Sequence, residues 1–132
     1  MNTKRIFISH AWKYDEHYEK VVEWFNNESY FRWSNYSVPK EDNCGDGYIP
    51  NYKLKECLTN QINPSQYVVI LSGLYVSYSD WIEYEIEEAR RIGKYIIGVR
   101  PWGNTQLPQI VQEKADIIVG WNSKSIIDAI KG

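Results

Sequence analysis

Short runs of apolar, often β-branched residues recur along the chain and alternate with longer, more polar stretches. Unbroken apolar runs bounded by turn-forming residues are typical of strands that are buried on both faces. One weaker run, at 33–38, alternates between polar and apolar positions, which indicates an edge strand. The predicted strands are residues 5–8, 33–38, 67–71, 95–99 and 116–119.

The polar stretches carry apolar residues three and four positions apart, the spacing of amphipathic helices. The most regular of them begins at Ser79, and its Ile82, Ile86 and Ala89 share the face that is expected to point toward the sheet. Ser79 or Asp80 is predicted to cap its first turn. The predicted helices are residues 15–26, 52–62, 79–92, a shorter one after Pro108, and 123–130.

Strand and helix alternate along the chain, which predicts a parallel sheet with helices on both faces. For five strands we expect the order 2-1-3-4-5, the flavodoxin-like three-layer α/β sandwich. The 132 residues contain no linker, repeat or low-complexity tract, so we expect a single domain over residues 1–132.

This topology predicts where a ligand would bind. Open α/β sheets hold ligands beyond the carboxyl ends of the strands, where the strand order reverses, here between the first and third strands. The segments expected at that edge are Ser9-His10-Ala11-Trp12, Ser72-Gly73-Leu74-Tyr75, the helix start at Ser79, Arg100-Pro101-Trp102-Gly103 and Gly120-Trp121-Asn122.

Composition narrows the class of partner. The formal charge of −2, from 15 basic and 17 acidic residues, favours neither nucleic acid nor a membrane surface. No apolar stretch approaches the roughly 20 residues that span a bilayer, and the N-terminus lacks the apolar core of a signal peptide, so we expect a cytoplasmic protein. Cys44 and Cys57 lack zinc-ligand spacing, and we expect no metal. The 6 Trp and 11 Tyr serve either core packing or stacking on flat ligands.

Several other activities that this fold supports are disfavoured by the loops. The loop after the first strand contains no glycine, so it does not match a flavin phosphate loop. Leu71-Ser72 stands where a response-regulator receiver has its aspartate. The chain contains neither a P-loop nor a GxSxG nucleophile motif.

Glu85 differs from the other acidic residues of the helix at 79–92. At about 100° per residue it projects between Trp81 and Ala89, roughly 60° from the centre of the apolar stripe. A carboxylate there is partly desolvated, so its placement needs a reason: either a structural hydrogen bond or presentation to a ligand. Glu87 and Arg91 are expected to pair on the solvent side. The remaining polar residues expected to face outward or to flank the apolar stripe are Asp80, Glu83, Tyr84 and Glu88.

Two motifs resemble those of TIR domains, namely Phe7-Ile8-Ser9-His10 and Ser79-x-Trp81-x-x-x-Glu85. The chain as a whole, including 69–72 and 120–122, resembles the small TIR-like (ThsB-type) proteins of bacterial anti-phage Thoeris systems. The resemblance implies that Glu85 is catalytic in cleaving NAD, which is a substrate rather than a cofactor. The substrate-binding residues that we expect are Ser9, His10, Ala11, Trp12, Ser37, Ser72 and Trp81.

The resemblance also implies a product and partners. NAD would be converted to a cyclic ADP-ribose isomer that activates a separate effector, after self-association and a phage-derived trigger. The Glu85 carboxylate would stabilise an oxocarbenium-like transition state, and Trp81, or an aromatic residue of the loop after the first strand, would stack on a flat ring. His10 would bind ribose or diphosphate oxygens, or serve only its own loop. Two other functions stay open: a non-catalytic TIR-like interaction module and a nucleoside 2-deoxyribosyltransferase-like enzyme.

Overall fold

The fold follows from the described part of a computed structural model, which comprises residues 3–9, 16–37, 56, 59–71, 75–100 and 109–132. Of residues 75–82 the backbone is described but not the side chains. The elements are β1 (Lys4–Ser9), α1 (Glu16–Asn27), β2 (Trp33–Asn35), β3 (Tyr67–Leu71), α3 (Tyr75–Arg91), β4 (Tyr95–Val99), α4 (Gln109–Lys114), β5 (Ile117–Val119) and α5 (Ser123–Lys131). Residues 56 and 59–62 are also helical.

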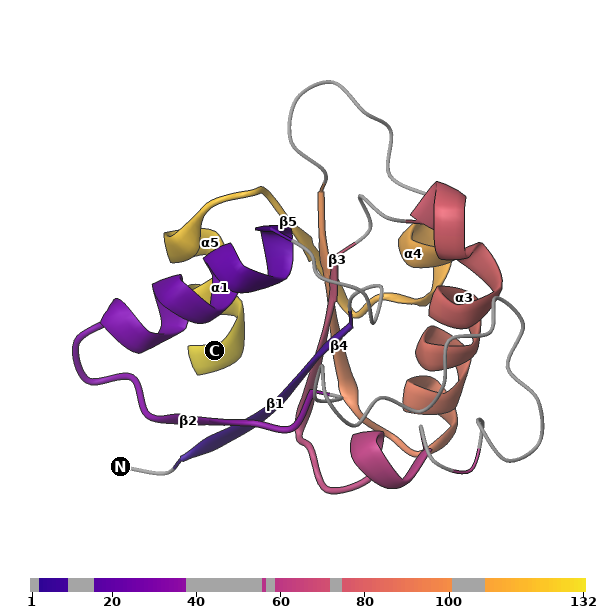
Figure 1. Ribbon diagram of the computed structural model, residues 1–132, viewed down its shortest axis with the longest axis horizontal. Coiled ribbons are helices and arrows are strands. Elements are labelled where there is room, and N and C mark those ends of the chain that lie inside the picture. Colours follow the sequence, from indigo (N-terminus) through magenta and orange to yellow (C-terminus); the bar gives the residue numbers. More distant parts are fainter. Residues whose placement is uncertain (1–2, 10–15, 38–55, 57–58, 72–74, 101–108) are drawn as a thin grey trace.

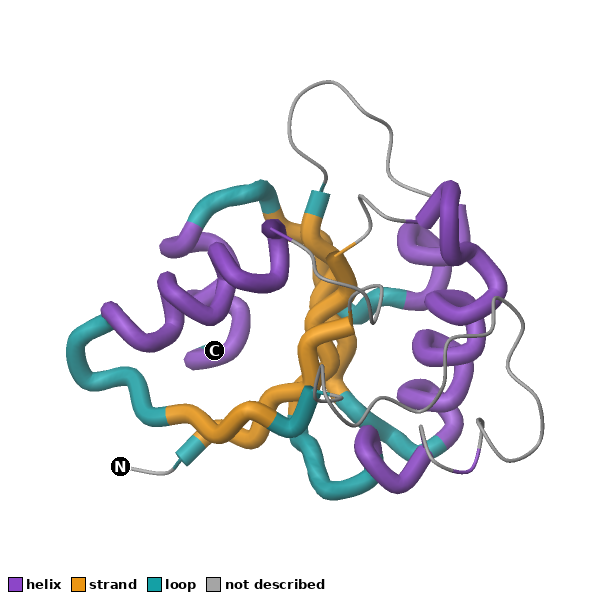
Figure 2. Tube along the Cα trace, viewed as in Figure 1, coloured by secondary structure: helices purple, strands orange, loops and turns teal. Residues whose placement is uncertain are grey.

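The strands form one parallel sheet in the order β2-β1-β3-β4-β5, as predicted. In Figure 1 the sheet is seen edge-on, with α1 and α5 on the left and α3 and α4 on the right. Figure 2 shows the same three layers, strands in orange between helices in purple. The predicted flavodoxin-like α/β sandwich is therefore confirmed.

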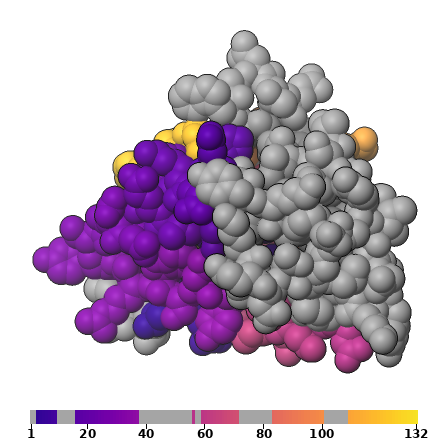
Figure 3. Space-filling model, viewed as in Figure 1, coloured from indigo at the N-terminus to yellow at the C-terminus, as the bar shows by residue number. Residues whose placement is uncertain are grey.

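Strand alternation sorts the apolar side chains into two cores. Ile6 and Ile8 of β1 point to the face that α1 and α5 cover, where Phe25 and Ile126 belong to the same cluster. Phe7 points to the opposite face and packs in a second cluster with residues of α3 and α4. Because side chains alternate along a strand, Ser9 continues the line of Phe7 toward α3. The surface of α1 and the segment after it forms the left side of Figure 3.

Helix α3 begins earlier than predicted. It starts at Tyr75, so Ser79 and Asp80 lie within the helix and neither caps its N-terminus. A capping side chain contributes only about 1 kcal/mol, and residues 75–78 contain no proline or glycine that would stop the helix from extending. The local capping signal is outweighed by the additional helical turn.

Strand β2 is shorter than predicted, ending at Asn35 instead of Val38. The Asn35 side chain accepts a hydrogen bond from the backbone N–H of Ser37 at 2.9 Å. Such a local side-chain bond offers the backbone an alternative to the sheet ladder, which ends the strand. Pairing with β1 continues for one residue, because Tyr36 N–H donates to the Ile6 carbonyl at 2.8 Å.

Gly98 of β4 allows α4 to lie close to the sheet. A Cβ atom at this position would stand 2.7 Å from Cγ1 of Val111 and 3.3 Å from Cβ of Ala115. The first distance is well inside normal carbon contact and the second is slightly short of it. Within the described ranges, no helix has the length and apolar character needed to cross a bilayer.

Candidate functional site

The candidate site contains a carboxyl group buried between α3 and the end of β1. Glu85 is only 2 % exposed, and Ser9, the last residue of β1, is fully buried. The Ser9 hydroxyl donates a hydrogen bond to Oε1 of Glu85. The contact lies at the carboxyl end of β1, next to β3, where the topology predicted a site.

The surroundings of Glu85 disfavour its charge. Burial raises the pKa of Glu85 to about 8, although the hydrogen bond from Ser9 lowers it in part. In the described ranges, no basic side chain forms an ion pair with Glu85. The carboxyl group is therefore mostly protonated at neutral pH, and a cation brought beside it would favour the charged form.

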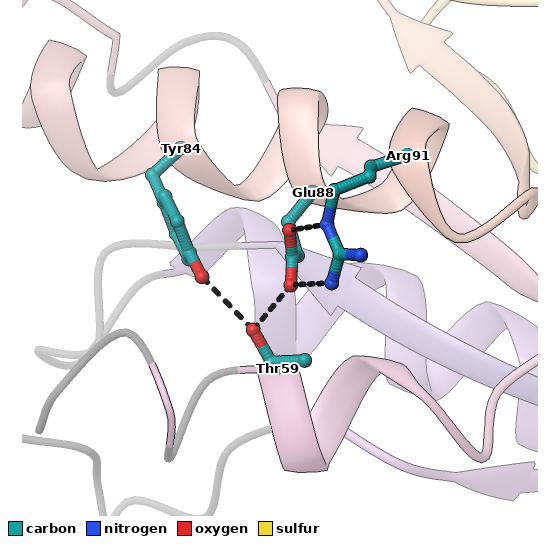
Figure 4. Close-up of polar contacts among 4 residues, drawn as sticks. All are labelled: Thr59, Tyr84, Glu88 and Arg91. Carbon is teal, nitrogen blue, oxygen red and sulfur yellow. Dashed lines mark hydrogen bonds and ion pairs between the residues drawn. The ribbon is translucent and has the colours of Figure 1, made fainter. Parts of the chain in front are cut away.

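Glu88, one turn further along α3, is a buried acid of the opposite kind (Figure 4). The Arg91 guanidinium donates two hydrogen bonds of 2.7 Å to Glu88, one from Nε to Oε1 and one from Nη2 to Oε2. The Thr59 hydroxyl donates to Oε2 at 2.5 Å, and it also lies 2.9 Å from the Tyr84 hydroxyl. These partners hold the pKa of Glu88 below its ordinary value, and the hydrogen bonding of Arg91 has the largest effect. The charge of Glu88 is therefore matched by Arg91 within the chain.

The prediction for this flank of α3 was wrong. Glu88 was expected to flank the apolar stripe or face outward but is 7 % exposed, and Tyr84 packs partly against the core instead of facing solvent. Arg91 pairs with Glu88 rather than with Glu87. The reason is that the helical segment 59–62 packs beside α3 and covers it from a second direction, which helical periodicity alone does not reveal.

Ser37 lies next to the same strand end. Its side chain is buried, and its hydroxyl oxygen accepts a hydrogen bond from the backbone N–H of Ile8 at 2.9 Å. Because β2 has already ended at Asn35, the Ser37 hydroxyl replaces a backbone carbonyl of that strand as the acceptor for the Ile8 N–H. Ser37 therefore holds the β1 backbone one residue before Ser9, and its expected contact with a substrate stays a prediction.

The structure does not describe all of the other residues that were expected to bind substrate. His10, Ala11, Trp12 and Ser72 lie outside the described residues, as do Cys44 and Cys57. Trp81 is placed one turn before Glu85 on α3, and its side chain is not described. Among the described side chains, no group of three or more His, Cys, Asp or Glu residues is arranged to hold a metal ion.

The direct pairing of Ser9 with Glu85 was not predicted, although both residues were singled out. The signal was present in the sequence. Alternation along residues 5–9 puts Ser9 on the same side as Phe7, and the angular position of Glu85 on its helix points it toward the sheet. Combining these two periodicities would have placed the serine and the glutamate face to face.

Comparison with known proteins gives one family. The model of a family described as "Thoeris protein ThsB, TIR-like domain" matches residues 7–106, which is well over half of the chain and includes both Ser9 and Glu85. A search among curated proteins returns no match.

Proposed function

Because the chain belongs to the TIR-like domain family of Thoeris protein ThsB, we propose that it cleaves NAD at the nicotinamide–ribose bond during anti-phage defence. The product is a cyclic isomer of ADP-ribose that signals to a separate effector. One observation carries the proposal: Glu85 is buried at the end of β1 with a serine as its partner, and no described basic side chain pairs with it.

The chemistry needs a negative charge beside a developing positive one. When the bond between ribose C1′ and the pyridinium nitrogen breaks, its electron pair goes to the nitrogen and leaves neutral nicotinamide. Positive charge then moves to the C1′–O4′ unit of the ribose. The Glu85 carboxylate stabilises that cation, and nicotinamide leaves without needing a proton.

The second half of the reaction decides the product. A nucleophilic atom of the adenosine part attacks C1′ and gives up a proton to solvent or a neighbouring base, which closes the ring. If water attacks instead, the product is linear ADP-ribose. The family of the chain favours the cyclic product, and residues near the site, Trp81 among them, are proposed to exclude water.

The raised pKa of Glu85 fits a site that is completed by its substrate. The nicotinamide group of NAD is cationic, and an opposite charge beside a buried carboxyl favours the ionised form. Substrate binding therefore supplies the positive charge that the described side chains do not provide, and the carboxyl proton leaves to solvent. Self-association after a phage-derived trigger would complete the remaining contacts.

The test compares wild-type protein with Glu85→Gln and with Glu88→Gln, which makes the same chemical change one turn away. Each protein, at high protein concentration, is incubated with NAD in the presence and absence of extract from phage-infected cells. Nicotinamide and the adenine-containing products are then identified by mass spectrometry. We expect wild type and Glu88→Gln to release nicotinamide and Glu85→Gln to release at least about 100-fold less, the size of effect seen when one electrostatic group is removed.

Each other outcome points elsewhere. Full turnover by Glu85→Gln would contradict the catalytic assignment. Intact NAD in every arm, together with trigger-dependent self-association, would identify a protein-interaction module. Consumption of deoxynucleosides in a parallel incubation, with NAD untouched, would identify a 2-deoxyribosyltransferase-like enzyme.

A further inference from the structure

We propose that Ser9 is a positioning residue, whose hydroxyl orients and activates the carboxyl group of Glu85 and does not itself contact the substrate. This inference rests on the proposed function, and it changes the role expected for Ser9 from the family resemblance. It concerns one hydrogen bond, from Oγ of Ser9 to Oε1 of Glu85.

The backbone that carries Ser9 is fixed from two sides. Ser9 pairs with Ile70 in the parallel ladder between β1 and β3, and the preceding Ile8 N–H is held by the Ser37 hydroxyl at 2.9 Å. The Ser9 side chain is also fully buried. Its hydroxyl is therefore held in place before any ligand arrives, as a group that orients a catalytic residue must be.

The hydrogen bond from Ser9 occupies one carboxyl oxygen of Glu85 and leaves the other available to a ligand. Ser9 engages Oε1, while Oε2 has no hydrogen-bond partner among the residues that the structure describes. A fully buried serine whose hydroxyl already donates its hydrogen bond to Oε1 is poorly placed to donate one to a ribose or diphosphate oxygen as well. Oε2 is accordingly the oxygen that we assign to the ribose.

Among the residues that the structure describes, Ser9 is the one whose hydrogen bond acts on the pKa of Glu85. On this face β1 and β3 present the apolar Phe7, Val68 and Ile70, and Arg5 near the start of β1, whose Nε donates to the Pro64 carbonyl. Several charged and titratable groups on α3 and α4 that the structure describes have hydrogen-bond partners other than Glu85. Tyr84 and Glu88 bond to Thr59, Arg91 bonds to Glu88, Arg90 donates to the Lys114 carbonyl of α4, and Glu113 precedes that residue.

Positioning and substrate contact predict different kinetics. A hydrogen bond to a carboxylate favours its ionised form, so removing the Ser9 hydroxyl raises the pH at which Glu85 ionises. Ser9→Ala should therefore lower kcat by roughly 10-fold to 100-fold, the value of a hydrogen bond to a charged group, and move the acidic limb of the pH–kcat profile to higher pH. A substrate contact would instead raise KM and leave the profile in place.

The decisive measurement does not require turnover. Infrared difference spectra between each protein and its Glu85→Gln counterpart isolate the carbonyl band of the protonated Glu85 carboxyl group, which is followed from pH 5 to pH 10. We expect the band to disappear near pH 8 in wild type and at a higher pH in Ser9→Ala. Ser9→Thr, which keeps the hydroxyl, should restore the wild-type midpoint and kcat. Ser9→Cys, with a weak donor of similar shape, should lie between and replaces Ser9→Ala if that variant does not fold.

The two proposals can fail separately. If wild type releases no nicotinamide but the band midpoint still depends on the Ser9 hydroxyl, the NAD reaction is wrong and the pairing stands. If the midpoint is the same in wild type, Ser9→Ala and Ser9→Cys, or if only KM changes, the positioning role of Ser9 is wrong.

Discussion

Glu85 and Glu88 lie one turn apart on α3, both nearly inaccessible to solvent, and their carboxyl groups respond to burial in opposite ways. Glu88 is held by Arg91 and Thr59, which keeps its pKa low. Glu85 accepts a hydrogen bond from Ser9 and is otherwise desolvated by burial, which raises its pKa to about 8. Burial alone therefore does not decide the pKa of a carboxyl group; the presence or absence of a compensating cation does.

The pair gives a first prediction, on stability against pH. The pKa of Glu85 is higher in the folded chain, about 8, than its ordinary value of 4.5. Between these values the folded state holds a proton that the unfolded state has released, so this group makes the protein less stable as pH rises, until the folded carboxyl ionises. Glu85→Gln, which resembles the protonated form, should remove that loss.

We expect Glu85→Gln to gain stability relative to wild type between pH 5 and pH 8, by an amount on the order of a few kcal/mol at about 1.4 kcal/mol per pH unit. Above pH 8 the difference should level off. Urea unfolding at pH 5, 7 and 9 measures it. Parallel stability curves for the two proteins would show that Glu85 ionises normally.

The second prediction concerns Glu88→Gln and has the opposite sign. The folded pKa of Glu88 is lowered, so its contribution is present above the ordinary value of 4.5 and is lost as pH falls through the folded pKa. Because the Arg91 side chain is 65 % exposed, solvent screening limits the loss at pH 7 to about 1 kcal/mol. The same unfolding series checks it; a loss that persists at pH 3 would contradict the charge pairing.

The third prediction concerns Ser37→Ala. This change leaves the buried N–H of Ile8 without the oxygen that accepts its hydrogen bond at 2.9 Å, which costs about 1–3 kcal/mol. Ser37→Thr keeps the oxygen and should recover most of that loss. Hydrogen exchange at the Ile8 amide gives a local readout: we expect faster exchange in Ser37→Ala only, and an unchanged rate would rule the bond out.

The fourth prediction concerns the contact between α4 and the sheet. Gly98→Ala places a methyl group 2.7 Å from Cγ1 of Val111 and should destabilise the fold by about 1–3 kcal/mol. Val111→Ala removes the clashing atom, so the double variant should be more stable than the two separate losses add up to. Thermal unfolding of the four proteins in this cycle measures the coupling, and strict additivity would contradict the close approach.

Strand positions were predictable from the sequence because a strand buried on both faces must be apolar throughout. Residues 67–71 and 95–99 were predicted with the boundaries that the structure has. The start of α3 was not, because a capping signal at Ser79 is weak compared with a further helical turn. Local patterns thus predict what an element is better than where it begins.

The candidate site was predictable in part, for a similar reason. The edge of the sheet and the separation of Glu85 from the outer acids follow from topology and helical periodicity. The burial of Glu88 and the bond between Ser9 and Glu85 depend on which neighbour packs against which flank. The helical segment 59–62 and the end of β1 come from distant parts of the chain, and periodicity within one element carries no information about them.

The bond between Ser9 and Glu85 joins residues 76 positions apart. β1 precedes β3 in the chain and lies inside the sheet, so it can pair with β3 only after residue 71 has been made. Contacts of such long sequence separation form late in folding. A nascent or truncated chain that stops before α3 lacks Glu85, so the pair of Ser9 and Glu85 cannot form in it.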